Sequence, residues 1–247
     1  MGVLSVVVPA YDEEQRIGRS LDRVLAWSVE RARPLEIVVV DDGSRDRTAA
    51  LVEGYAARGV RLVRLPANRG KGAALRAGVA ASTGEQVLIS DADFSTPIAE
   101  VDRLEPLLAE AAIVLGSRAT KDSRITVRQP AWREIAGKTF NLAIRLLGVA
   151  GIRDSQCGFK LLRGEVAREL FAEMTVDRFA FDVELILLAR ERGYRVAEVG
   201  VEWLNDPASR VHLLRDGTRM LADVVRLRLR RLRRAREHGA GAGTVRR

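Results

Sequence analysis

Short runs of consecutive apolar residues recur along the first half of the chain, with amphipathic stretches between them. The apolar runs show no alternation with polar residues, which is typical of strands buried on both faces of a parallel sheet. The stretches between them repeat apolar residues at helical spacing, as Ile17, Leu21 and Val24 do. We predict strands at about 4–8, 36–40, 60–65, 87–89 and 113–115, and helices at about 13–27, 44–58, 72–81 and 97–108.

Strands and helices that alternate in this way predict an α/β fold, with a mainly parallel sheet and helices on both of its faces. Ligands of such folds bind outside the carboxyl ends of the strands. Acidic and polar residues follow three of the predicted strands, so their convergence on one edge of the sheet predicts a binding site there. These residues are Tyr11-Asp12-Glu13, Asp41-Asp42, and Asp91 with Asp93.

The formal net charge of the 247 residues is +8, and it belongs to one end of the chain. Residues 215–247 contain 11 Arg against three acidic residues, a net charge equal to that of the whole chain, so the remainder is about neutral. We predict one globular domain over residues 1–214, a basic helix over 215–236 and a disordered tail over 237–247.

The residue inventory excludes several kinds of site. The single cysteine, Cys157, rules out an internal disulfide framework and a cysteine-based zinc site. Two histidines, His212 and His238, leave little for a histidine metal site or a Ser-His-Asp triad. No apolar run approaches the roughly 18 residues needed to cross a bilayer, and the chain enters a strand almost at once. We therefore expect a cytoplasmic protein.

Two segments of the first half suggest a phosphate-bearing ligand. Asp91 and Asp93 directly follow a predicted strand, and two carboxylates one residue apart suit a Mg²⁺ or Mn²⁺ that also binds phosphate oxygens. An ordinary acidic turn is the alternative. The loop Asn68–Gly72 opens a predicted helix with Arg69 and Lys71, which suits a phosphate or the edge of a base. A tight strand-to-helix turn is the alternative for this loop.

Several segments occur together and in one order along the chain. In the first half they are Val7-Val8-Pro9-Ala10-Tyr11-Asp12-Glu13-Glu14, Val39-Val40-Asp41-Asp42-Gly43-Ser44, Asn68-Arg69-Gly70-Lys71-Gly72 and Asp91-Ala92-Asp93. In the second half they are Gly116-Ser117-Arg118, Asp154-Ser155-Gln156-Cys157-Gly158-Phe159-Lys160 and Phe179-Ala180-Phe181-Asp182-Val183-Glu184. The first set resembles glycosyltransferase family 2, which has the GT-A fold. The second set resembles the branch of polyprenyl-phosphate (dolichyl-phosphate) β-glucosyltransferases, close to the dolichyl-phosphate mannose synthases.

The resemblance implies a GT-A domain over residues 1–214 that performs an inverting, metal-dependent transfer of a hexose onto a polyprenyl phosphate, with UDP-glucose as the favoured donor. Pro9, Tyr11 and Glu13 would line the base and ribose, with Asp41 accepting a hydrogen bond from the uracil ring. Lys71 would lie near the base or the diphosphate. Asp91 would face the ribose or the metal, next to Ala92, and Asp93 would be the main ligand of Mg²⁺ or Mn²⁺. Arg118 and Arg210 would balance the charge of the leaving diphosphate.

The acceptor decides whether a catalytic base is needed. A hydroxyl acceptor loses a proton during attack, whereas a phosphate monoester is already an anion near pH 7. Asp182 and Glu184, in an apolar segment, are the base candidates, and Asp154 is a third. A buried carboxylate that holds Arg178 or a backbone amide is the structural alternative. A soluble or glycan hydroxyl acceptor, a GDP-mannose donor and a non-enzymatic basic adaptor stay open as other hypotheses.

A lipid acceptor requires access to a membrane. A predicted helix over about 132–147 has apolar, aromatic and cationic residues at helical spacing, which suits either a membrane interface or the edge of the core. We expect Arg128, Arg133 and Lys138 to contact the lipid phosphate. The arginine-rich C-terminus is expected to bind an anionic surface on the inner face of the cell membrane, with a solvated tail as the alternative and no nucleic acid expected. Many relatives that use lipid phosphates carry transmembrane helices, and this sequence shows no such segment.

Overall fold

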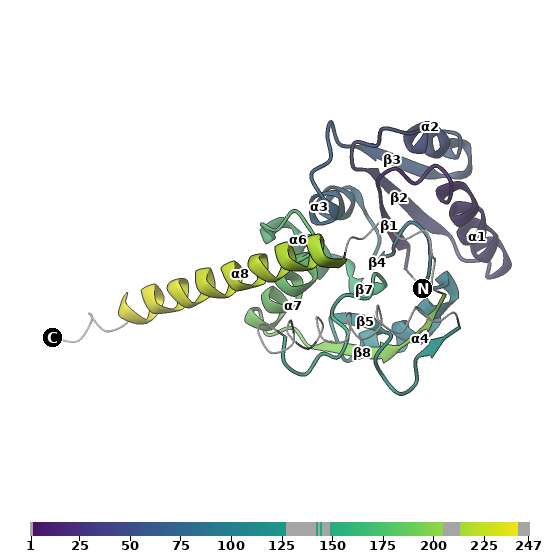
Figure 1. Cartoon of the computed structure of the whole chain (residues 1–247). Helices are drawn as coiled ribbons and strands as arrows, with labels where there is room; N and C mark the ends of the chain where they lie inside the picture. Colours follow the sequence, from purple (N-terminus) through teal and green to yellow (C-terminus); the bar gives the residue numbers. More distant parts are fainter. Residues whose placement is uncertain (1, 127–141, 143, 145–148, 205–212, 242–247) are drawn as a thin grey trace.

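The fold is built around a seven-stranded sheet (Figure 1). The computed structural model describes residues 2–126, 142, 144, 149–204 and 213–241. The strand order across the sheet is β3-β2-β1-β4-β7-β5-β8. These strands are β1 (Leu4–Ala10), β2 (Leu35–Asp41), β3 (Val60–Arg64), β4 (Gln86–Ile89), β5 (Ile113–Ser117), β7 (Lys160–Arg163) and β8 (Val196–Gly200).

Most neighbouring strands of this sheet are parallel. β1 pairs in parallel with β2 on one side and with β4 on the other. The pairs β2–β3 and β5–β8 are parallel as well, whereas β7 is antiparallel to both of its neighbours, β4 and β5. The predicted mainly parallel sheet is therefore confirmed. Because β2, β1 and β4 are adjacent and run the same way, their carboxyl ends lie together at one edge.

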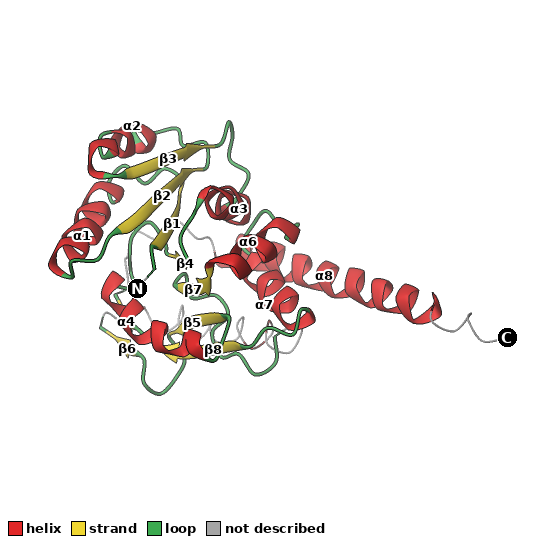
Figure 2. Cartoon of the chain, turned by 180° about the vertical axis from the view of Figure 1, so that it is seen from behind, coloured by secondary structure: helices red, strands yellow, loops and turns green. Residues whose placement is uncertain are grey.

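Helices cover both faces of the sheet, as predicted (Figure 2). Successive residues of a strand point to opposite faces, and β1 shows this directly. Val6 and Val8 belong to a core that also contains Leu21 of α1. Val7 belongs to a second core, with Leu75 of α3. The helices are α1 (Ile17–Glu30), α2 (Thr48–Glu53), α3 (Lys71–Ala81), α4 (Val101–Leu104), α6 (Gly164–Glu173), α7 (Phe181–Glu191) and α8 (Leu213–Gly241), with 3₁₀ turns at Ala56–Arg58, Ile98–Glu100 and Glu105–Ala109.

Two of the predicted helices are shorter or broken. The helix predicted at 97–108 consists of α4 between two 3₁₀ turns. Pro106 explains the break, since proline has no N–H to donate and its ring clashes with the preceding turn of a helix. The helix predicted at 44–58 is reduced to α2 and a 3₁₀ turn, which Gly59 ends with a φ of +83°.

The second half of the chain adds elements for which the sequence pattern gave no prediction. β7 and β8 extend the main sheet, and α6 and α7 cover one face of it. β6 (Arg124–Ile125) pairs with β9 (Glu202–Trp203) in a separate parallel sheet of two strands. β6 and β9 have only two residues each, too few for a periodic pattern to stand out.

The C-terminal helix α8 begins on the body of the protein and projects away from it (Figure 1). Met220 and Val224 are buried in the same core as α7, which agrees with a packed first half. The helix ends at Gly241, so it continues past its predicted end at residue 236 into the segment predicted to be disordered. No proline interrupts residues 237–241, so helical hydrogen bonding is able to continue there. Among the described residues, no helix is both long and apolar enough to span a membrane.

Candidate active site

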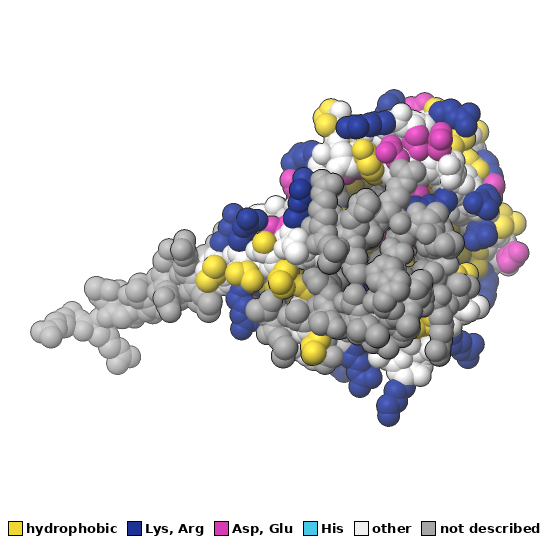
Figure 3. Space-filling model, viewed as in Figure 1, with side chains coloured by type: hydrophobic (Ala, Val, Ile, Leu, Met, Phe, Trp, Pro, Cys, Tyr) yellow, Lys and Arg dark blue, Asp and Glu magenta, His cyan; other side chains and the backbone are white. Residues whose placement is uncertain are grey.

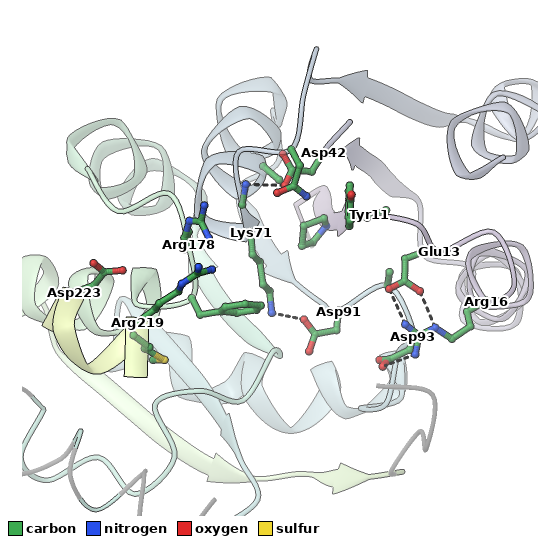
Figure 4. Close-up of a pocket in the computed structure, with 18 residues that line it drawn as sticks. Tyr11, Glu13, Arg16, Asp42, Lys71, Asp91, Asp93, Arg178, Arg219 and Asp223 are labelled. Atoms are coloured by element: carbon green, nitrogen blue, oxygen red, sulfur yellow. Dashed lines mark hydrogen bonds and ion pairs between the residues drawn. The ribbon is translucent and has the colours of Figure 1, made fainter. Parts of the chain in front are cut away.

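A pocket of about 420 Å³ opens at the carboxyl ends of β1, β2 and β4 (Figure 4). The first half of the chain supplies most of its wall, and α8 and the turn before α7 supply the rest. The strand ends therefore converge as predicted, although the role of each residue stays a prediction. Seven residues predicted to bind the nucleotide sugar line the pocket: Pro9, Tyr11, Glu13, Lys71, Asp91, Ala92 and Asp93.

The chain that follows β1 is tied to the chain that follows β2. The amide of Asp12 donates to Ser44 Oγ at 2.9 Å. The amide of Glu13 donates to Thr48 Oγ1 at 2.7 Å. The Glu13 carboxylate also forms an ion pair with Arg16 at 2.7 Å. These contacts fix the backbone of this segment and so fix the direction in which its side chains enter the pocket.

Two acidic residues lie at the end of β2, and Asp42 is the one that lines the pocket. Its carboxylate accepts hydrogen bonds from the amides of Arg69 and Gly70, both at 2.8 Å. Burial raises the pKa of Asp42 although these bonds oppose the shift. Asp41, the predicted partner of the uracil ring, is buried, and its Oδ1 accepts from the amide of Ser44 at 3.1 Å. Asp41 is not among the residues that line the pocket.

The loop Asn68–Gly72 packs closely on the turn that precedes α7. Gly70 has a φ of +109°, and a Cβ there would lie 2.5 Å from the carbonyl oxygen of Asp177. A Cβ on Gly72 would lie 2.3 Å from the carbonyl oxygen of Val176. Both glycines are required by this close approach of two backbones. The loop is thus a tight strand-to-helix turn, and it also contributes to the pocket wall.

Lys71, the first residue of α3, points its ammonium group at Asp91 and forms an ion pair with it (Figure 4). Burial would lower the pKa of Lys71, but the charges of Asp91 and Asp182 outweigh it and raise that pKa. Burial would likewise raise the pKa of Asp91, but Lys71 outweighs it and lowers that pKa. Both groups are therefore charged near neutral pH, and Lys71 holds the Asp91 carboxylate in place.

Asp93 has a different environment from Asp91. One of its oxygens accepts from the amide of Ser95 at 2.9 Å, and the other lies 3.7 Å from a guanidinium nitrogen of Arg16. Burial, and then the charge of Asp91, raise the pKa of Asp93. A cation bound between the two carboxylates would relieve this repulsion.

The segment that precedes β7 reaches Asp91 from the second half of the chain. Gly158 lies so close that a Cβ there would be 1.9 Å from Asp91 Oδ2. Its neighbour Cys157 is buried, and burial raises the pKa of the thiol to about 11. The thiol is therefore protonated at neutral pH, and the segment contributes close packing to the site rather than a nucleophile.

Gly158→Ala should displace the Asp91 carboxylate and lower the catalytic efficiency of the predicted hexose transfer about a hundred-fold, as a misplacement of about 1 Å is able to do. The fold should persist, because the clash is with the end of a side chain. Steady-state kinetics on the variant would measure the loss. Gly18→Ala is the matched control, since its Cβ would make only an ordinary contact, 3.4 Å from Tyr55 Oη. A Gly158→Ala enzyme as active as this control would contradict the prediction.

The half-buried Arg118 and the buried Asp154 form an ion pair with two parallel hydrogen bonds. Nε and Nη2 of Arg118 donate to the two Asp154 oxygens at 2.7 and 2.9 Å, and the Arg118 amide donates at 3.0 Å. Burial would raise the pKa of Asp154, but the charge of Arg118 outweighs it and lowers that pKa. The Arg118 guanidinium also lies 5.5 Å from the ring centre of Trp203. Asp154 thus orients an arginine, which is not the environment expected of a general base.

Asp182 lies behind the pocket wall, in the first turn of α7. It is 5% exposed and pairs with the fully buried Lys160 at 2.6 Å. Burial raises the pKa of Asp182 despite the charges of Lys160 and Lys71. Lys160 also donates to the carbonyl oxygen of Cys157. The ammonium groups of Lys160 and Lys71 lie 5.8 and 5.7 Å from the ring centre of Phe181, so a single aromatic side chain contacts both cations.

Glu184, the other base candidate in α7, is occupied by the backbone. Its carboxylate accepts from the amides of Thr175 and Val176 at 3.0 and 2.8 Å, and from the Thr175 hydroxyl at 2.8 Å. These contacts match the structural alternative of a carboxylate that holds backbone amides, and the partner is not Arg178. Within the described part of the chain, neither Glu184 nor Asp182 lines the pocket.

Some predicted contacts lie outside the described residues, and some pocket residues were not predicted. Outside the described residues are Arg128, Arg133, Lys138 and Arg210, and most of the predicted helix at 132–147. Arg16 could have been found from its spacing of three residues from Glu13 in the segment predicted to be helical. The residues from the second half enter the pocket through tertiary contacts that have no local signal. Asp42 and Asn68 belong to segments that were predicted to lie at the site, whereas the unpredicted lining residues include Arg16, Arg178, Phe179, Arg219, Met220 and Asp223.

Comparison with known proteins decides the family. The family described as "Glycosyl transferase family 2" matches residues 5–171, which is more than half of the chain. The chain belongs to glycosyl transferase family 2. The resemblance seen in the sequence motifs is therefore confirmed, and the pocket is that of a family 2 glycosyltransferase.

Relatives of this family 2 chain include enzymes that act on a lipid phosphate. The dolichyl-phosphate β-glucosyltransferase of Dictyostelium discoideum is 36% identical over 244 residues, which cover 93% of this chain and 75% of the relative. The dolichyl-phosphate β-glucosyltransferase of Homo sapiens is 36% identical over 245 residues, covering 93% of this chain and 76% of the relative. The similarity extends past the family match and includes α7 and much of α8.

Solved structures of other glycosyltransferases share the fold of this family 2 chain. Mannosyl-3-phosphoglycerate synthase from Rubrobacter xylanophilus superposes with a TM-score of 0.68 at 24% identity, covering 96% of this chain and 75% of that one. Glucosyl-3-phosphoglycerate synthase from Mycobacterium tuberculosis, in complex with Mn²⁺, UDP-glucose and phosphoglyceric acid, superposes with a TM-score of 0.66 at 20% identity, covering 92% and 79%. At these identities the comparison concerns the fold alone, and it confirms the predicted GT-A fold.

The donor atoms at the end of β4 fit a hard divalent cation in this family 2 chain. Asp91 and Asp93 offer carboxylate oxygens one residue apart, and a backbone amide uses only one oxygen of Asp93. No group of three or more His, Cys, Asp or Glu side chains that could hold a metal occurs among the described residues. Mg²⁺ often binds through one or two carboxylates and completes its shell with waters and substrate phosphates. The pair therefore suits a metal that arrives with a phosphate-bearing ligand.

Proposed function

We propose that this chain transfers glucose from UDP-glucose to a polyprenyl phosphate, with inversion at the anomeric carbon and with Mg²⁺ or Mn²⁺ bound. The observation that carries the proposal is the pocket in which Lys71, Asp91 and Asp93 lie beside Tyr11 and Glu13. The names of relatives 36% identical over 93% of the chain support a glucose donor and a lipid phosphate acceptor. A structural neighbour that holds Mn²⁺ and UDP-glucose supports the same donor and metal.

The reaction exchanges one carbon–oxygen bond for another. An oxygen of the lipid phosphate attacks C1 of glucose, the bond from C1 to the β-phosphate oxygen breaks, and UDP leaves with the bonding electron pair. Negative charge grows on the leaving diphosphate, so groups that bind the transition state more tightly than the ground state accelerate transfer. A bound divalent ion supplies such stabilisation at the diphosphate, and Asp91 and Asp93 are the residues that would hold it.

Lys71 and Arg118 each form an ion pair with a carboxylate, and each pair supports the proposed transfer. Lys71 keeps the Asp91 carboxylate ionised and oriented, so that it is ready to bind a cation. Arg118 is oriented by Asp154, and 33% of its side chain is exposed, so it is able to bind an anion. Lys71 has the largest effect in lowering the pKa of Asp91, and the charge of Arg118 acts in the same direction. Arg118 is therefore our candidate for contact with a phosphate of either substrate.

The environments of the three candidate bases favour an acceptor that needs none. Asp154 is used by Arg118, Glu184 by backbone amides, and Asp182 by Lys160. A lipid phosphate is already an anion near pH 7 and attacks without losing a proton. A sugar hydroxyl would need a general base within hydrogen-bond reach of the pocket. The second hypothesis, a soluble or glycan hydroxyl acceptor, is therefore less well supported.

Asp182→Asn should lower the turnover of polyprenyl phosphate less than tenfold per folded molecule, because its carboxylate faces Lys160 and not the pocket. Loss of a true general base typically costs about 10²–10⁴ in rate. The measurement is a single-turnover rate, corrected for the folded fraction, since a buried lysine loses its partner in this variant. The matched variant Glu184→Gln should behave in the same way. A loss of a thousand-fold in Asp182→Asn would instead favour a hydroxyl acceptor with Asp182 as its base.

The proposed reaction is tested directly with radiolabelled nucleotide sugars. The protein is incubated with a short polyprenyl phosphate, MgCl₂ and labelled UDP-glucose in detergent, and the lipid is extracted. We expect label in the lipid fraction, less of it after chelation of the metal, and little with GDP-mannose as the donor. Absence of label in lipid with every nucleotide sugar would contradict the proposal. Label that appears only in a soluble glycan would support the hydroxyl acceptor instead.

The projecting part of α8 supports attachment to a membrane surface. Val225 and Leu229, one helical turn apart, are 41% and 52% exposed. Hydrophobic side chains lie along the described part of this helix with basic side chains beside them (Figure 3). Such a helix suits the interface of an anionic bilayer. Co-sedimentation with phosphatidylserine vesicles should be strong at low salt and weaker at high salt, and equal binding to neutral vesicles would contradict an electrostatic contribution.

A further inference from the structure

Two arginines enter the pocket from parts of the chain that are distant in sequence. Arg178 belongs to the turn before α7, and Arg219 belongs to the second turn of α8. Figure 4 shows both guanidinium groups on the side of the pocket away from Asp93. Both residues are exposed, so each is open to a ligand.

Neither arginine has a hydrogen-bond or ion-pair partner for its side chain among the described residues. The other two cations that line the pocket are both paired, Arg16 with Glu13 and Lys71 with Asp91. Of the four cationic side chains that line the pocket in the described part of the chain, two are therefore neutralised by a carboxylate and two are not.

The acidic residues nearest in sequence are engaged elsewhere. Asp177 precedes Arg178 directly, but its carboxylate forms an ion pair with Arg76 of α3. Asp223 lies four residues after Arg219, at the spacing of a helical ion pair, but it pairs with Arg226 at 2.9 Å. Both carboxylates that could have neutralised the two arginines are thus used by other cations.

The backbones that carry the two arginines are fixed. Met220, next to Arg219, is 5% exposed, and its sulfur accepts a hydrogen bond from Gln156 Nε2 at 2.8 Å. The Cγ of Arg178 would lie 3.0 Å from a Cβ on Gly70, which places it against the loop that opens α3. Two positive charges held at one end of a partly enclosed pocket repel each other, and a bound anion removes that cost.

We propose that Arg178 and Arg219 form a phosphate-binding subsite, which makes the first turns of α8 part of the substrate site. Guanidinium groups suit phosphate because their planar fork donates paired hydrogen bonds. The inference rests on the proposed function, in which both substrates carry phosphate. The diphosphate of the nucleotide sugar and the monophosphate of the lipid share this chemistry, and the experiment separates them.

The variants are Arg178→Gln, Arg219→Gln and the double variant, each of which removes charge and keeps a polar side chain. Arg230→Gln is the matched control, since it removes one exposed arginine from the same helix outside the pocket. Calorimetry with UDP and MgCl₂ gives the dissociation constant of the nucleotide, and initial rates give the KM for a short polyprenyl phosphate. Melting temperatures check that the variants remain folded.

Each single variant should weaken one of these two constants about tenfold relative to the control, and the double variant should weaken it further. A weaker dissociation constant for UDP assigns the subsite to the donor. A higher KM for polyprenyl phosphate, with UDP binding unchanged, assigns it to the acceptor.

Variants whose two constants both stay within about twofold of the Arg230→Gln values would overturn the subsite. The wild-type chain is assayed first, so that the two proposals fail in different ways. A wild type that transfers no sugar contradicts the proposed function, whereas an active wild type with unaffected variants contradicts only the subsite.

Discussion

Asp93→Asn should lower the rate of glucose transfer about a thousand-fold while leaving the melting temperature unchanged. The asparagine oxygen is still able to accept the hydrogen bond from the amide of Ser95, so the local turn persists. The other carboxylate oxygen becomes an NH₂ group, which does not bind a hard cation. The variant therefore separates the proposed metal contact of Asp93 from its structural contact.

Rate and metal dependence are measured together, with Mn²⁺ titrated at fixed UDP-glucose. The apparent metal affinity of Asp93→Asn should fall along with its rate. Asp102→Asn is the matched control, because Asp102 forms only an exposed ion pair with Arg31, at 3.0 Å, away from the pocket. Asp93 would lose its assigned role if the variant kept a rate within tenfold of this control and the same response to Mn²⁺.

Lys160→Met should lower the free energy of unfolding by about 3–5 kcal/mol, the cost of leaving a buried charge without its partner. Lys160 is completely buried and neutralises Asp182 at 2.6 Å. Methionine fills a similar volume but offers no charge and no donor for the carbonyl oxygen of Cys157. Urea denaturation measures the loss, and the exposed Lys121→Met is the control for the same change at the surface.

A second substitution tests whether the loss comes from the unpaired carboxylate. Adding Asp182→Asn to Lys160→Met removes the buried charge that the first change leaves behind. The double variant should recover about 2 kcal/mol relative to Lys160→Met alone. A Lys160→Met protein as stable as the Lys121→Met control would show that the pair contributes little. Strictly additive losses in the double variant would show that the two side chains act independently.

The edge of the sheet on which the site is built was predictable because its signals are local. An apolar run that ends in acidic residues marks both a strand and its carboxyl end, and parallel order then brings such ends together. This reasoning identified Tyr11, Glu13, Asp91 and Asp93, which line one pocket. It also identified Lys71, because a glycine-rich turn with a cation opens the helix that follows β3.

The contacts of the site residues in the second half of the chain could not be predicted from the sequence, for a physical reason. The apolar residues next to Asp182 and Glu184 in the sequence predicted that both are buried, and both are 5% exposed. It did not identify their partners, since Lys160 approaches Asp182 only once β7 has entered the sheet. Asp154 likewise has its partner, Arg118, 36 residues away. Pairings of this kind depend on the tertiary arrangement and leave no periodic trace.

The choice between Asp41 and Asp42 shows a finer limit. The motif places two acidic residues at the end of β2, and an extended chain turns them to opposite sides. Which of them lines the pocket depends on the register of β2 with β1, in which Ala10 is paired with Asp41. A shift of one residue would exchange the two. The sequence pattern contains the pair but not the register, so the structure is needed to find that Asp42 lines the pocket, and the predicted contact of Asp41 with the uracil ring stays a prediction.

Because β7 runs antiparallel to its neighbours, the chain that it brings to the pocket edge differs in kind from the loops that follow β1, β2 and β4. A parallel strand brings the chain that follows it to the pocket edge, but β7 brings the chain that precedes it, including Gly158. The chain leaves β7 at the far edge, where the amide of Gly164 bonds to the carbonyl oxygen of Glu85 at 2.7 Å. For protein engineering, the connection that enters β7 is thus a unit distinct from the loops after β1, β2 and β4. Exchanging it between relatives offers a way to alter the packing around Asp91 while leaving those three loops intact.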